Sequence, residues 1–69
     1  MKELNENKVS LILSKTADGI TCRMDGEVTL EDFTEIRSHV IPLTAAQKTT
    51  VLNFAVNVAI PSFKAQEGV

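Results

Sequence analysis

The feature that most constrains this 69-residue chain is the pair Asp18-Gly19, which lies between two runs of alternating apolar residues. Such a pair is a strong β-hairpin signal, because both central positions of a type I′ turn need a positive φ. We therefore expect a hairpin of residues 8–15 and 20–28, turning at Asp18 and Gly19. Cross-strand partners share a face, so this pairing gathers one apolar set: Val9, Leu11, Leu13, Ile20, Cys22, Met24 and Val28.

Residues 29–41 predict a helix. Thr29 is a favourable N-cap, and Asp32 occupies the third position of a capping box. Pro42 would end this helix. The apolar residues fall on one stripe at helical spacing: Leu30, Phe33, Ile36, Val40 and Ile41.

Residues 44–60 fit two interpretations. As a helix, Thr44 is the N-cap and Gln47 completes a capping box before the helix-forming residues that follow. As a strand, apolar residues alternate with small or polar ones from Leu52 to Ile60. The explicit cap favours the helix, and Pro61 would end either element.

These elements predict a small α+β domain in which an N-terminal β-hairpin is followed by two helices (ββαα). The alternative is ββαβ, with residues 50–60 as a third strand. We expect one domain over residues 1–69, with residues 1–7 as a frayed polar lead-in and residues 61–69 as a tail.

The small size of the domain limits how it can be stabilised. A single core in fewer than about 70–80 residues rarely supplies more than about 3–5 kcal/mol. Cys22 is the only cysteine, so an intrachain disulfide is excluded, and one cysteine with one histidine cannot complete a zinc site. Oligomerisation would supply the missing burial, and the lone cysteine without a signal-peptide pattern predicts a cytoplasmic location.

Negative charge is concentrated in residues 16–35, which carry six carboxylates and one arginine. This acidic centre argues against duplex binding, which needs a basic surface. Carboxylates at the start of a helix would explain part of the run through the helix dipole. The functional alternative is an acidic surface that docks a basic partner or mimics nucleic-acid phosphate, formed by Asp25, Glu27, Glu31, Asp32 and Glu35.

The sequence predicts no catalytic, cofactor-binding or metal-binding residues. His39 is the only histidine, and no glycine-rich phosphate loop is present. The Asp-Gly pairs also fail as calcium loops, because aligning Gly26 with the loop glycine puts Arg23 where an oxygen ligand is required. We therefore expect a protein that is not an enzyme.

The strongest functional signal is the absence of charge from Thr49 to Phe63. One small sheet cannot cover the wide apolar surface of this segment, and uncovered apolar surface marks an interaction site. The expected function is a protein–protein interaction module, a homodimeric regulator, inhibitor or adaptor that binds no membrane. A nucleic-acid-related regulator or an acidic decoy is the alternative. The expected self-association residues are Val51, Phe54, Val58 and Phe63.

Overall fold

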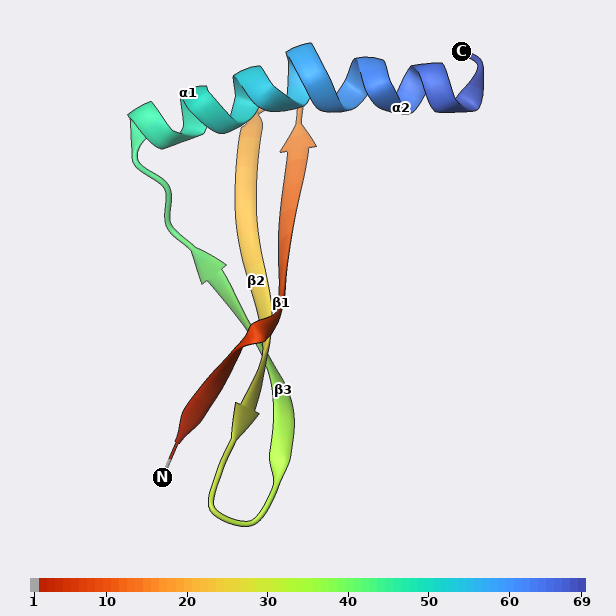
Figure 1. The fold of residues 1–69 in the computed structure, drawn as a ribbon. Coiled ribbons are helices and arrows are strands. Elements are labelled where there is room, and N and C mark those ends of the chain that lie inside the picture. Colours follow the sequence, from red (N-terminus) through yellow and green to blue (C-terminus); the bar gives the residue numbers. More distant parts are fainter. Residues whose placement is uncertain (1) are drawn as a thin grey trace. The chain divides into compact units, whose positions relative to one another are not determined.

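The computed structural model describes residues 2–69 and confirms the α+β class. Three strands, β1 (Glu3–Thr16), β2 (Gly19–Thr29) and β3 (Thr34–Ile41), form an antiparallel sheet of order β1-β2-β3. One helix of 23 residues follows, divided into α1 (Ala45–Phe54), a π-helical segment η1 (Ala55–Ala59) and α2 (Ile60–Glu67) (Figure 1). The architecture is therefore βββα.

The chain divides into two compact units. One contains residues 2–14 and 21–42, which form most of the sheet. The other contains the hairpin tip, residues 15–20, together with residues 43–69.

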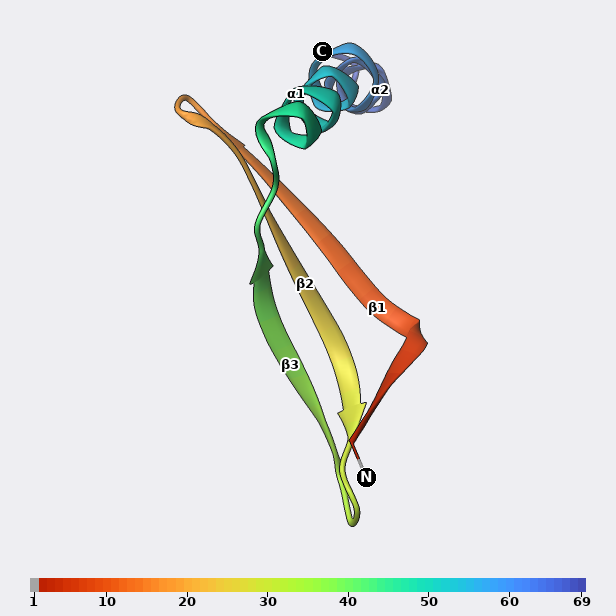
Figure 2. The same cartoon turned by 90° about the vertical axis from the view of Figure 1, so that its left-hand side faces the viewer.

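The predicted N-terminal hairpin is confirmed, but its turn is displaced by one residue. Ala17 and Asp18 form the turn, and β2 begins at Gly19 (Figure 2). Gly19 has a φ of 146°, whereas no residue other than glycine has a positive φ among residues 2–69. The type I′ turn expected at Asp18-Gly19 is therefore wrong, since Asp18 does not adopt the left-handed conformation which that turn requires.

β1 extends back to Glu3, so most of the expected lead-in is strand, and it bends sharply near its N-terminal end (Figure 2). The side chains of Leu4 and Val9 both approach Gly26 from the same side of the sheet. Leu4 and Val9 are five positions apart, so in a regular strand they would project from opposite faces. They share a face only because an extra residue interrupts the alternation, as in a β-bulge. The backbone N–H of Asn7 donates to Asn5 Oδ1 at 3.2 Å within this bend.

The helix predicted over residues 29–41 is wrong, because these residues end β2 and form β3. Thr29 pairs with Thr34, and the antiparallel register continues to Cys22 opposite Ile41. The backbone N–H of Leu30 donates to the Phe33 carbonyl at 2.8 Å, closing a four-residue hairpin loop. The T-x-x-D pattern that resembled a capping box therefore belongs to the end of β2 and the hairpin loop.

The helical interpretation of residues 44–60 is confirmed, and the alternative third strand there is wrong. Thr44 is the N-cap: Gln47 N–H donates to Thr44 Oγ1 at 3.2 Å, and the Gln47 side chain accepts from Thr44 N–H at 2.9 Å. Both halves of the predicted capping box are thus present. The hydroxyls of Thr49 and Thr50 donate to carbonyls four residues back, which satisfies them within the helix.

Pro61 does not end the helix, so the predicted tail at residues 61–69 is also corrected. Residues 60–67 are helical, and Gly68 caps them in a left-handed conformation. A proline inside a helix removes one N–H donor and crowds the carbonyl four residues earlier. The π-helical segment just before Pro61, in which Ile60 N–H donates to the Ala55 carbonyl, widens the turn where this crowding arises.

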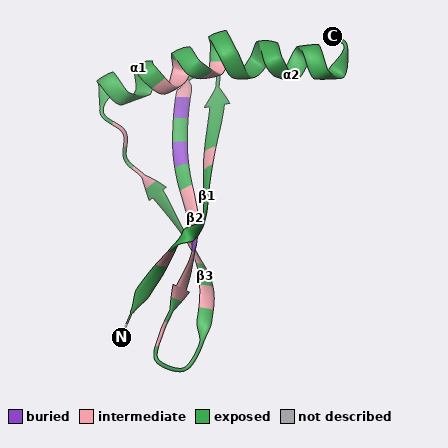
Figure 3. Cartoon of the chain, viewed as in Figure 1, coloured by how far each residue is buried: buried purple, intermediate pink, exposed green. Residues whose placement is uncertain are grey.

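The core is small. Ile20 and Cys22 are the buried apolar side chains among the described residues, and both lie on the face of β2 that the hairpin register predicts to be apolar. Met24 and Val28, from the same predicted face, are only half-buried. Most of the helix and of β1 is exposed (Figure 3).

Candidate functional site

The first candidate surface is the helix, whose 23 residues include none that is buried. Half-burial is confined to one short stripe, Val51, Leu52 and Ala55. An apolar helix normally owes its stability to packing against other elements. This helix therefore presents far more apolar surface than its own unit covers.

Three of the four predicted self-association residues are exposed on this helix. Phe54 is 55% exposed, Val58 lies four residues later and is also exposed, and Phe63 is 66% exposed. Val51 is half-buried. Phe54 is therefore not part of a buried core.

The C-terminal end of the helix adds a shallow apolar hollow. Val69 N–H donates to the Lys64 carbonyl at 2.9 Å, which turns the chain back beyond Gly68. Ala59, Ile60, Phe63 and Val69 contribute the apolar lining. Sequence reasoning missed Ile60 and Val69, because the end of the helix was expected at Pro61.

The acidic residues do not form one surface. Asp25 and Glu27 lie on one face of the sheet, whereas Glu35 pairs with Val28 and so lies on the other face. Glu31 and Asp32 belong to the β2–β3 loop. Since no helix begins at residue 29, the helix dipole does not explain this acidic run.

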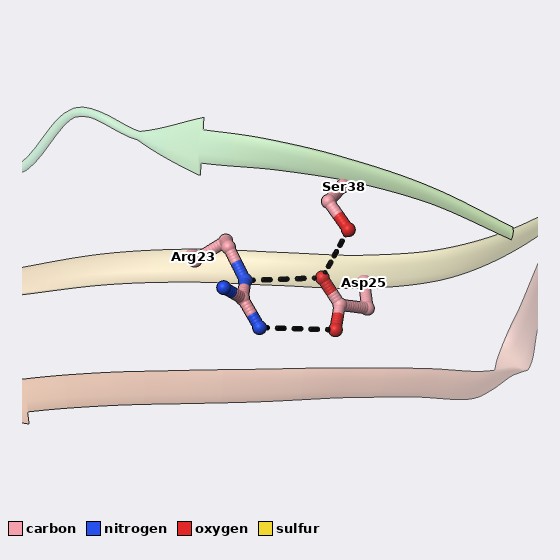
Figure 4. Close-up of polar contacts among 3 residues, drawn as sticks. All are labelled: Arg23, Asp25 and Ser38. Carbon is pink, nitrogen blue, oxygen red and sulfur yellow. Dashed lines mark hydrogen bonds and ion pairs between the residues drawn. The ribbon is translucent and has the colours of Figure 1, made fainter.

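Asp25 is part of a polar cluster that joins β2 to β3 (Figure 4). The Ser38 hydroxyl donates to Asp25 Oδ1 at 2.6 Å, and Arg23 Nε and Nη2 approach the two carboxylate oxygens at 3.2 and 3.4 Å. The Ser38 hydrogen bond, with help from Arg23, holds the pKa of Asp25 below its ordinary value despite some desolvation. The cluster is therefore a charged cross-strand link, and the Asp25 charge is already paired with Arg23.

The opposite face of the same strands carries a second ion pair, Arg37 with Glu35. Arg37 and His39 flank a cavity of about 110 Å³ on the sheet. Leu4, Met24, Gly26, Val28 and Ile41 complete its lining. His39, expected near the C-terminus of a helix, thus lies on β3 beside an apolar concavity.

Residues 2–69 contain no group of three or more His, Cys, Asp or Glu side chains arranged to hold a metal ion. No helix in the same range combines the length and apolarity needed to cross a bilayer. Comparison with known proteins finds no family model that matches the chain, and no curated protein or solved structure that is significantly similar to it.

Proposed function

We propose that this chain is a non-enzymatic protein–protein interaction module that associates with a second copy of itself through the helix. The supporting observation is a helix of 23 residues, uncharged from Thr49 to Phe63, in which no residue is buried. The contact residues are Val51, Phe54, Val58 and Phe63. A protein partner would use the surface that the pair leaves exposed.

There is a physical reason to expect a second copy of the chain on the helix, and not an unrelated protein. A small domain without a disulfide or metal buries little apolar surface of its own, and binding of a second copy to the folded chain adds stability by mass action. Aromatic residues are enriched where such interfaces are fully buried. Phe54 and Phe63 are two of the three aromatic residues in the chain.

Phe54→Asp tests the proposal. A carboxylate buried against an apolar partner surface has no compensating contact, so we expect self-association at least about 100-fold weaker, measured by analytical ultracentrifugation. Asn53→Asp introduces the same charge at the neighbouring exposed position and is the matched control.

Circular dichroism on both variants separates a lost contact from a lost fold. The proposal predicts helical signal in Phe54→Asp at concentrations where the wild-type chain is dimeric. A wild-type chain that stays folded and monomeric at tens of micromolar would contradict it.

A further inference from the structure

The third strand, β3, forms one edge of the sheet. In the order β1-β2-β3, its inner side pairs with β2, and no strand among residues 2–69 pairs with its outer side. Such an edge presents a row of backbone N–H and C=O groups that can accept another strand. Its sequence, TEIRSHVI, contains no lysine and no proline that would discourage pairing.

The exposed apolar side chains of β3 are arranged symmetrically. Ile36 is 68% exposed and Val40 is 76% exposed. They lie opposite Glu27 and Arg23, so both project from the same face of the sheet. Each is two residues from Ser38. Isoleucine and valine therefore stand at equal distances on either side of one small residue.

Pairing β3 with an identical antiparallel strand limits the possible registers. In a two-fold antiparallel pair, residues that lie opposite each other must project from the same face of the sheet. Because side chains alternate between faces, this holds only when the axis is at a residue, so that this residue lies opposite its own copy. An axis at Arg37 would place like charges directly opposite each other, and an axis at Glu35 would do the same. With an axis at Ile36, only Thr34–Ser38 of each chain would lie opposite β3 of the other, so fewer residues would pair.

The axis at Ser38 avoids these conflicts. It pairs Glu35–Ile41 of one chain with the same residues of the other, and each Ile36 then lies opposite a Val40. Arg37 lies opposite His39 and keeps its own ion pair with Glu35. Pairs of β-branched side chains are among the favourable cross-strand contacts in sheets.

We propose that β3 pairs antiparallel with β3 of a second copy about a two-fold axis at Ser38, forming a continuous six-stranded sheet. The inference shares with the proposed function only the choice of a second copy as partner. It places that copy on a different surface, the sheet edge. Ile36 and Val40 determine the register by covering each other across the axis.

Cysteine cross-linking tests this register. In a Cys22→Ala background, Ile36→Cys and Val40→Cys chains are prepared separately, then mixed and oxidised gently. Directly opposite residues in an antiparallel pair have Cα atoms about 4.5–5.5 Å apart, which a disulfide can bridge. We expect a disulfide-linked heterodimer in the mixture on non-reducing gels.

Each single-cysteine chain alone is the internal control. In the proposed register, position 36 of one chain lies four residues from position 36 of the other, about 14 Å along the strand. We therefore expect little cross-linking in either chain alone. Efficient self-cross-linking of Ile36→Cys would indicate an axis at Ile36 and overturn the proposal, as would absence of a product in the mixture.

This result separates the two proposals. A dimeric wild-type chain without cross-linking in the mixture overturns the β3 pairing and leaves association through the helix standing. Cross-linking in the mixture, with Phe54→Asp leaving association unchanged, supports β3 pairing and contradicts the helix interface.

Discussion

The two edges of the sheet, β1 and β3, differ in how they resist pairing. β1 carries Lys8 and Lys15 and bends between Leu4 and Val9. Charged side chains and bulges of this kind discourage a further strand from adding to an edge. β3 has no lysine, and its two charged side chains, Glu35 and Arg37, form an ion pair with each other. Both edges expose apolar side chains, so the lysines and the bend of β1 make the difference.

This difference between the β1 and β3 edges would let a small sheet form a dimer without aggregating. A sheet with two open edges can add chains indefinitely, whereas a sheet with one open edge forms a closed pair. If β3 pairs with β3, the outer strands of the resulting sheet are the two protected β1 strands. The asymmetry between the edges would therefore limit growth by strand pairing to two copies.

The largest expected effect concerns the attachment of β1. A Cβ added at Gly26 would lie 2.8 Å from Leu4 Cδ1 and 3.7 Å from Val9 Cγ1, so Gly26→Val requires the Leu4 side chain to move and crowds the side of β2 on which β1 packs. We expect a loss of about 1–3 kcal/mol in the free energy of unfolding, measured by urea denaturation. Adding Leu4→Ala removes the obstructing side chain, so the double variant should lose less than the sum of the two single variants. If the double variant loses the full sum of the two single losses, position 26 and Leu4 are not in contact.

A smaller effect is expected from protecting β3 in the way that β1 is protected. Ile36→Lys places a charge at an exposed position. In the proposed dimer it removes both Ile36–Val40 contacts, one on each side of the two-fold axis. We expect self-association through β3 to weaken about tenfold by sedimentation, with the monomer fold retained. Leu11→Lys makes a similar change on exposed β1 and should leave association unchanged; equal weakening would remove the distinction between the edges.

The smallest expected effect concerns the inner side of β3, where Ser38 binds Asp25. Because the folded-state pKa of Asp25 is lowered, this carboxylate stabilises the fold above its ordinary pKa, and that stability is lost as pH falls through the folded-state value. Ser38→Ala removes the main cause, so the pKa of Asp25 should rise toward 3.8. NMR titration of the carboxyl measures this, and an unchanged pKa would contradict the role of the hydrogen bond.

The failed prediction at residues 29–41 has an identifiable cause. Ile36 and Val40 are four residues apart, a spacing that places them together on a helix and equally on one face of a strand. Thr29 and Asp32 fit a helix cap as well as a hairpin loop. Four β-branched residues in Thr34–Ile41 favoured a strand and could have corrected the prediction.

The candidate surfaces were only partly predictable. Exposure of Phe54, Val58 and Phe63 was expected from the uncharged, apolar segment formed by residues 49–63. The β3 edge could not be identified before β3 was known to be a strand. For the same reason, the acidic residues were grouped together, although their strand register divides them between two faces and a loop.

The sequence by itself determined the features that depend on neighbouring residues: the hairpin, through alternation and Gly19, and the helix start, through the reciprocal bonds of Thr44 and Gln47. Only the tertiary structure decided which residues of β2 pair with residues 34–41, because partners in this register lie as far apart in the chain as Cys22 and Ile41. It likewise decided that Gly26 accommodates Leu4 from the bent end of β1. Hydrogen bonds and contacts across such distances have no fixed spacing in the sequence, so no local pattern records them.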